Sequence, residues 1–156
     1  APMPPGFPAP WSAPLPGGGR WIVWDKRDGI GSNDQSDFEI GWISGPRRAD
    51  RIISHLWSGW TKASERGVPR VHPTQKPIAV MRWCLEFMAD AETILDPFMG
   101  SGTTLVACAK MGRKGIGIEM DPGYFNAACR RVEQAYREPD MFVVVPQPQP
   151  KQEALF

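Results

Sequence analysis

The stretch LDPFMGSGTT, residues 95–104, places an acid, a proline and two glycines directly after an apolar run. Before it, TILD (93–96) predicts a short buried strand. After it, TTLVACAK (103–110) predicts a helix and GIGIEM (115–120) a second strand. This order is that of a parallel βαβ unit, in which ligands bind beyond the carboxyl ends of the strands. The sequence therefore predicts an α/β fold with a ligand site at 96–102.

The glycines of this loop let the backbone approach a ligand, and the helix after them directs free N–H groups to the same place. A P-loop needs Lys before Thr, but here Gly102 runs directly into Thr103. The dinucleotide pattern GxGxxG also fails, because Leu105 stands where its third glycine belongs. A tight strand-to-helix turn without a ligand remains the alternative for the loop alone.

Glu119 closes the second strand, about twenty residues after the loop, where a carboxylate accepts hydrogen bonds from ribose hydroxyls. The alternative is a solvated acid at a strand end. Together, the loop and Glu119 favour a ligand that carries an adenosyl group. Asp121 with Pro122 then predicts the start of another helix, which aligns the side chains of Phe125, Cys129, Val132 and Tyr136.

A further motif, VHPTQKP, precedes a helix predicted over roughly 76–89. His72 and Pro73 form a rigid turn, Thr74 is a candidate N-cap, and Lys76 in the first helical turn offers its charge to a carboxylate. His72 by itself is more often a structural residue than a catalytic one.

Length, charge and cysteine spacing restrict the other classes of protein to which the chain could belong. The 156 residues fit one domain, and a net charge of +1 restricts nucleic-acid binding to a local patch. Three cysteines without CxxC spacing argue against a disulfide framework and a zinc site. No signal peptide or membrane-spanning run is present in the sequence, so we expect a soluble, cytoplasmic protein.

The three motifs HPTQKP, LDPFMGSGTT and GIGIEMD, in this order, resemble the β-type (permuted) DNA amino-methyltransferases, which modify adenine N6 or cytosine N4. The upstream stretches GGGRWIVWDKRDG and DFEIGW resemble the phage-type members. The resemblance covers roughly residues 16–140. It implies a Rossmann-like class I methyltransferase sheet with helices on both faces.

The resemblance also implies S-adenosylmethionine as cofactor and no metal. The sulfonium is an activated methyl donor, so that the protein mainly positions it. Glu119 would take the ribose hydroxyls, Met120 would lie against the adenine, and the other residues would surround the methionine and ribose portion. The implied cofactor site comprises His72, Thr74, Lys76, Asp96, Pro97, Phe98, Gly100, Ser101, Gly102, Thr103, Glu119 and Met120.

The family's catalytic motif, Asp/Asn/Ser-Pro-Pro-aromatic, should precede residue 16. There the sequence offers only Met3-Pro4-Pro5-Gly6, and the look-alike Asp121-Pro122-Gly123-Tyr124 stands at a helix start, so the catalytic residues stay unassigned. A Pro-rich arm also cannot supply the central fourth strand, expected between the strands at 93–96 and 21–25. We therefore expect an incomplete sheet, completed by another polypeptide, closed differently, or belonging to a fragment.

The chain is expected to consist of a Pro/Gly-rich arm (1–19), a methyltransferase domain (20–140) and a tail (141–156) that begins with a last candidate strand, MFVVV. The segment 44–70 resembles a short target-recognition region, with Trp57 and Trp60 available for stacking on bases. A solvated basic face with core tryptophans is the alternative. The candidate DNA-binding residues are Arg47, Arg48, Arg51, Lys62, Arg66 and Arg70.

The leading hypothesis is a DNA methyltransferase, adenine N6 favoured over cytosine N4, in a bacterium or a phage-infected host. The alternatives are a non-catalytic module that binds S-adenosylmethionine and DNA, and a small-molecule or protein methyltransferase. Expected partners are DNA and a second copy or complementing chain. The terminal QEALF, Gln152–Phe156, resembles the QxxLF peptide that binds the sliding clamp, with a plain disordered end as the alternative.

Overall fold

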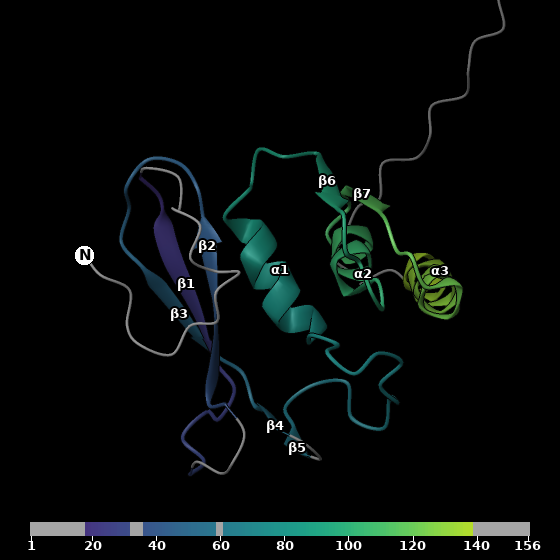
Figure 1. Cartoon of the computed structure of the whole chain (residues 1–156), viewed down its shortest axis with the longest axis horizontal. Coiled ribbons are helices and arrows are strands. Elements are labelled where there is room, and N and C mark those ends of the chain that lie inside the picture. The colour runs from purple at the N-terminus through teal and green to yellow at the C-terminus, as the bar shows by residue number, and fades with distance from the viewer. Residues whose placement is uncertain (1–17, 32–35, 59–60, 139–156) are drawn as a thin grey trace, which may run out of the picture. The chain divides into compact units, whose positions relative to one another are not determined.

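The computed structural model describes residues 18–31, 36–58 and 61–138 (Figure 1). The chain divides between Thr61 and Lys62 into two compact units, unit 1 before the division and unit 2 after it. The predicted N-terminal arm, the candidate strand 141–145 and the tail Gln152–Phe156 lie outside the described residues, apart from Gly18 and Gly19. No helix in the described part of the chain is long and apolar enough to cross a membrane.

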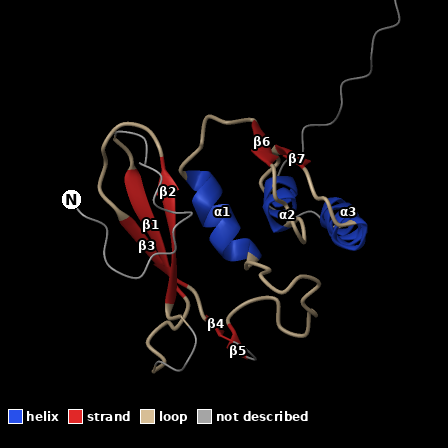
Figure 2. Cartoon of the chain, viewed as in Figure 1, coloured by secondary structure: helices blue, strands red, loops and turns tan. Residues whose placement is uncertain are grey.

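Unit 1 is built around a three-stranded sheet with the order β2-β1-β3 (Figure 2). β1 (Arg20–Asp25) pairs antiparallel with β2 (Phe38–Ile43), in a register that sets Trp21 opposite Trp42. The two indole rings meet edge to face at a centroid distance of 5.0 Å, a geometry that stabilises aromatic pairs. β1 confirms the strand expected at 21–25.

β3 (Arg51–Ser54) was not predicted, and it changes the expected strand order. It pairs in parallel with β1, on the edge opposite β2. The resemblance had placed a missing strand beside the strand at 21–25, but both edges of β1 are paired within unit 1. The expectation that the missing strand lies beside β1 is therefore wrong. The short run RIIS escaped prediction because charged residues surround its two isoleucines. Two further short strands, β4 (Trp57–Ser58) and β5 (Thr61–Lys62), pair at the division between the units.

Unit 2 contains the predicted βαβ unit. β6 (Thr93–Asp96), α2 (Thr103–Lys110) and β7 (Lys114–Gly117) follow one another, and the two strands are parallel, with Asp96 opposite Gly117. α2 packs against both strands and lies between α1 (Ile78–Glu86) and α3 (Pro122–Arg137) (Figure 1). Buried side chains of α1, β6, α2 and α3 form the core between these elements, and Leu85, Ala107 and Cys108 are at most 1 % exposed. The α/β class is confirmed, as a partial Rossmann-like fold.

The start of α1 differs from the prediction. The helix begins at Ile78, after Pro77, so Thr74 is not its N-cap and Lys76 is not in its first turn. A proline disfavours helical backbone in the residue before it, and this excludes Lys76 from the helix. The Thr74 hydroxyl instead lies 3.1 Å from Nδ1 of His72.

The start of α3 confirms the prediction, and the buried residues of the helix are small. The Asp121 side chain accepts a hydrogen bond from Tyr124 N at 2.9 Å, with Pro122 in the first turn. Phe125 and Tyr136, however, are 42 % and 55 % exposed, and the buried residues of the helix are alanines at 127, 128 and 135. Small side chains face inward because α3 lies directly against the backbone of the glycine loop.

Candidate functional site

The loop 97–102 is held between the carboxyl ends of β6 and β7. Ile118 N donates to Asp96 O at 2.9 Å and Met99 N donates to Ile118 O at 3.0 Å, so that the loop and the chain beyond β7 run side by side. Within the loop, the Asp96 carboxylate accepts a hydrogen bond from Phe98 N at 3.0 Å. These bonds place the loop at the edge of the sheet where parallel α/β proteins bind ligands.

Both loop glycines are required by the geometry. Gly102 has a φ of +71° at the start of α2, and a Cβ added there would lie 2.8 Å from Cβ of Ala128. Gly100 has a φ of +50° and lies against the ring of His72. The left-handed backbone explains why glycine stands at both positions. Gly102 additionally allows α3 to pack onto the loop.

Glu119 joins this loop to the start of α3. Its Oε2 accepts a hydrogen bond from Gly100 N at 2.9 Å, and its Oε1 accepts one from Asp121 N at 2.8 Å. A carboxylate offers roughly four acceptor positions, so two remain for a ligand hydroxyl pair. The side chain is half-buried and thus remains accessible. Glu119 therefore has the chemistry that a ribose requires.

The segment 71–76 is fixed by His72 and Gln75. His72 Nδ1 lies 3.2 Å from Thr74 N, which donates to it, and the neutral ring therefore carries its proton on Nε2. The ring meets that of Tyr124 at a centroid distance of 4.3 Å. Gln75 is buried, and its Oε1 accepts a hydrogen bond from Val71 N at 3.1 Å. His72 thereby connects this segment to both the glycine loop and α3.

The two segments enclose a cavity of about 290 Å³. It brings together eight of the residues predicted for the cofactor: His72, Thr74, Lys76, Asp96, Phe98, Gly100, Ser101 and Thr103. Pro97, Gly102, Glu119 and Met120 do not line it. Phe98 and Met120 are 89 % and 93 % exposed, so both side chains present their apolar surface to solvent.

Sequence reasoning missed Gln75, Met81, Met99 and Thr104, which also line the cavity, and Tyr124, which contacts His72. Met81 and Thr104 lie within the first turns of α1 and α2, where a cavity-facing residue has no sequence signal of its own. Gln75 lies inside the motif HPTQKP. Its burial in the structure identifies it as the residue that fixes the segment 71–76.

The candidate DNA-binding residues are divided between the two units. Arg47, Arg48 and Arg51 belong to unit 1, whereas Lys62, Arg66 and Arg70 belong to unit 2. Some of them make local contacts: Arg47 lies 3.0 Å from Asp50 Oδ1, and Lys62 donates to Val68 O at 3.0 Å.

The two tryptophans predicted to stack on bases are not both available for that role. Trp57 is only 5 % exposed, so it is a core residue and the stacking role is wrong for it. Trp60 lies outside the described residues.

A family model for N6/N4 DNA methylases matches residues 25–130. The Type II methyltransferase M2.LlaDCHI of Lactococcus lactis subsp. cremoris is 34 % identical over 117 residues, which are 72 % of this chain and 41 % of that enzyme. M2.DpnII of Streptococcus pneumoniae is 41 % identical over 83 residues, 52 % of this chain and 31 % of the enzyme. The matched segments thus span less than half the length of these relatives.

Two solved structures are similar. The complex of M1.HpyAVI with S-adenosylmethionine has 28 % sequence identity and a TM-score of 0.49, over 72 % of this chain and 60 % of that one. A putative DNA modification methylase from Thermus thermophilus, also complexed with S-adenosylmethionine, has 20 % identity and a TM-score of 0.49, over 74 % of this chain and 53 % of that one.

Proposed function

The chain belongs to the N6/N4 DNA methylase family, and from this premise we propose that it binds S-adenosylmethionine for methyl transfer to an amino group of DNA. The observation that carries the proposal is the convergence of segments 72–76 and 96–104 on one cavity, with Glu119 anchored beside it. The methyltransferase domain is proposed to comprise residues 20–140.

The residues fit the cofactor by their chemistry. Phe98 and Met120 offer apolar surface to it, Gly100 presents backbone without a side chain, and Glu119 retains acceptor capacity for the ribose hydroxyls. Lys76 at the cavity wall is proposed to attract the carboxylate of the methionine portion. When bound, the cofactor supplies an activated methyl group on its sulfonium, and the role of this chain is to orient that group.

The proposal assigns no residue to the target base. The 156 residues contain no Asp/Asn/Ser-Pro-Pro-aromatic motif. In the look-alike at 121–124, Asp121 caps α3 and the Tyr124 ring contacts His72, so both side chains have structural contacts. A second candidate function is a module that binds S-adenosylmethionine and DNA and needs a partner chain for catalysis.

Calorimetric titration of the full chain with S-adenosylmethionine tests the cofactor step, with Glu119→Gln as the matched variant. A saturable heat that Glu119→Gln weakens supports the proposal, and its absence in the unaltered chain rejects it.

A transfer assay with labelled cofactor on duplex DNA then separates enzyme from module. Recovery of N6-methyladenine supports the favoured target, and N4-methylcytosine in its place corrects it. If labelled DNA appears only after a complementing chain is added, the second candidate function is supported.

The partners follow from the same proposal. DNA is the proposed substrate, and self-association or a complementing chain is tested by light scattering of the purified chain. The sliding clamp is tested by pull-down with and without Gln152–Phe156; equal capture of both forms rejects the motif. The proposed setting is the cytoplasm of a bacterium or a phage-infected host.

A further inference from the structure

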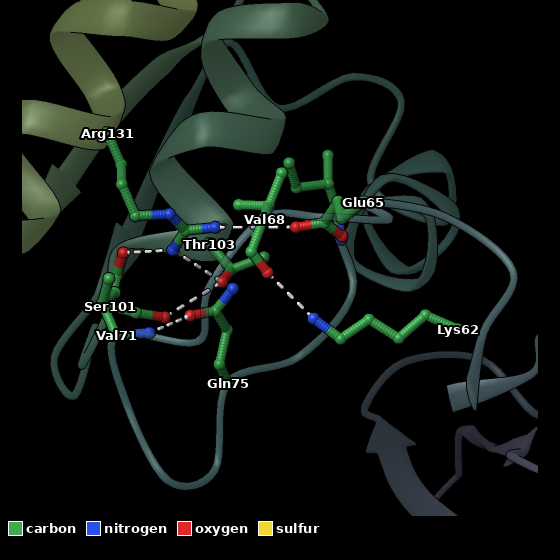
Figure 3. Close-up of polar contacts among 9 residues, drawn as sticks. Lys62, Glu65, Val68, Val71, Gln75, Ser101, Thr103 and Arg131 are labelled. Carbon is green, nitrogen blue, oxygen red and sulfur yellow. Dashed lines mark hydrogen bonds and ion pairs between the residues drawn. The ribbon is translucent and has the colours of Figure 1, made fainter. Parts of the chain in front are cut away.

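Arg131, on α3, reaches from the helix into the glycine loop (Figure 3). Its guanidinium donates to the carbonyl oxygen of Ser101 and lies 3.2 Å from the hydroxyl of Thr103. Ser101 and Thr103 are themselves buried, at 4 % and 5 % exposed, and their hydroxyls lie 3.2 Å apart. Since both residues line the cavity, Arg131 contacts the cavity wall from behind.

Glu65 holds the other side of the guanidinium. Its Oε1 lies 3.8 Å from Nη2 of Arg131, and the side chains are only 12 % and 15 % exposed, respectively. Burial lowers the pKa of Arg131 and the Glu65 carboxylate opposes this, but arginine stays protonated in proteins. The ion pair therefore keeps a permanent positive charge in place behind the loop.

The second oxygen of Glu65 anchors the opposite wall of the cavity. Oε2 accepts a hydrogen bond from Ile78 N at 2.9 Å, at the start of α1, where Pro77 provides no side-chain cap. A carboxylate at a helix N-terminus is stabilised by the free N–H groups and the helix dipole. Because α1 directly follows the segment 72–77, Glu65 fixes the end of that segment.

One ion pair thus connects both cavity walls to the segment 62–70. We propose that Arg131, held by Glu65, is a positioning residue for the amino-acid end of S-adenosylmethionine. It contacts no cofactor atom; it sets Ser101 and Thr103, and with them the backbone of the loop that faces the methionine portion. The inference rests on the proposed function and adds to it a dependence of cofactor affinity on residues outside the cavity.

The test compares two ligands on the full chain by calorimetry: S-adenosylmethionine, and 5′-methylthioadenosine, which keeps the adenosyl group and lacks the amino-acid end. Arg131→Met removes the donors and keeps most of the length of the side chain. We expect it to raise the Kd for S-adenosylmethionine about tenfold and that for methylthioadenosine less than about twofold. The reason is that Ser101 and Thr103, which lose the Arg131 donors, are proposed to lie beside the methionine portion, which methylthioadenosine lacks.

Glu65→Gln should also raise the Kd for S-adenosylmethionine relative to the Kd for methylthioadenosine, by a smaller factor than Arg131→Met. The amide still reaches Ile78 but no longer carries a charge. The double variant should resemble Arg131→Met alone, because the two residues act through one contact. Arg130→Met, its exposed neighbour on α3, is the matched control and should leave both ligands unaffected.

If Arg131→Met weakens the binding of both ligands equally, Arg131 only stabilises the fold and the inference is overturned. Unchanged affinity for both ligands also overturns it. Thermal unfolding of each variant accompanies the titrations; if Arg131→Met does not fold, the ligand ratio of Glu65→Gln decides. Failure of the unaltered chain to bind either ligand rejects the proposed function itself, a result distinct from selective binding that the variants leave unchanged.

Discussion

Two segments with proposed binding residues differ in how they are held, the glycine loop at 96–102 and the cationic stretch at 47–70. The loop is held by side chains from outside it: Glu119 bonds to Gly100 N, and Arg131 to the Ser101 carbonyl. In the other stretch, Arg47 pairs with Asp50 and Lys62 donates to Val68 O, both close along the chain, and Arg47 also donates to the carbonyl oxygen of Gly19. The loop backbone is held by side chains distant in the sequence, whereas the side chains of Arg47 and Lys62 bond mainly to groups close to them along the chain.

This difference predicts how each segment responds to substitution. A loop that works through its backbone is sensitive to changes in the side chains that pack on it, because these set its shape. Exposed cations contribute charge with little dependence on shape, and each substitution should remove a small, additive share of binding. The experiments below test this contrast, starting with the largest expected effect.

Gly102→Ala should have the largest effect of the substitutions. The new Cβ would sit on a left-handed backbone and lie only 2.8 Å from Cβ of Ala128. We expect the free energy of unfolding to fall by about 2–4 kcal/mol. Gly67→Ala is the matched control: φ is +75° but no atom lies within 4 Å, so strain alone, about 1 kcal/mol, remains. Urea denaturation measures both. Equal losses would contradict the role of the Ala128 contact.

Glu119→Gln should weaken binding of S-adenosylmethionine about ten- to hundredfold, because hydrogen bonds to a charged acceptor are replaced by an amide that has one oxygen. Glu92→Gln, an exposed acid just before β6, should leave the Kd unchanged. Calorimetry measures both. If the two variants bind alike, the ribose role of Glu119 is wrong.

Replacing Arg47 and Arg48 by alanine should reduce the salt dependence of DNA binding, lowering the slope of log K against log salt by about two. The same double substitution at Arg130 and Arg137, both exposed on α3, serves as the charge-matched control. Fluorescence anisotropy with a labelled duplex at several salt concentrations gives the slopes. An unaltered slope in the first variant excludes these phosphate contacts.

The smallest effect is a difference in pH response between the units. In unit 2, burial raises the pKa of the Cys84 thiol from 9.0 to about 11. The folded state therefore favours the neutral thiol, and this group destabilises the fold progressively as the pH rises above 9, until the thiol ionises in the folded state near 11.

In unit 1, the Arg27 amide donates to Asp25 and lowers the pKa of that carboxyl below its usual 3.8, against a smaller opposing effect of burial. This contribution is present above pH 3.8 and is lost as the pH falls through the folded value. In mild urea, NMR spectra should show that the folded signals of unit 1 are lost first in acid and those of unit 2 first in base. Loss of both units together at either end would show that they unfold as one.

The sequence predicted those parts of the site that depend on neighbours along the chain. α2 occupies the predicted 103–110, and Asp121 caps α3 as expected, because capping and the βαβ order are local signals. The strand expected at 115–120 ends at Gly117, yet Glu119 still lies beside the loop, since the backbone continues along β6 through Ile118.

The parts that sequence reasoning missed depend on distant partners. The cap of α1 comes from Glu65 and not from Thr74, and nothing in the sequence near Ile78 indicates this. Arg131 had a recoverable signal: it stands four residues from both Ala127 and Ala135, on the buried face of α3. An arginine between two buried alanines indicates an internal ion partner, but the spacing does not identify that partner as Glu65.

The ion pair between Glu65 and Arg131 joins nearly the two ends of the described part of unit 2. Contacts of such long sequence separation form late in folding, after the local strand–helix–strand structure, because closing a long loop costs chain entropy first. We expect Glu65→Gln to leave the refolding rate almost unchanged and to speed unfolding, as measured by stopped-flow fluorescence. The cavity would then be completed in the last step of folding, and a bound ligand would stabilise the unit by slowing its unfolding.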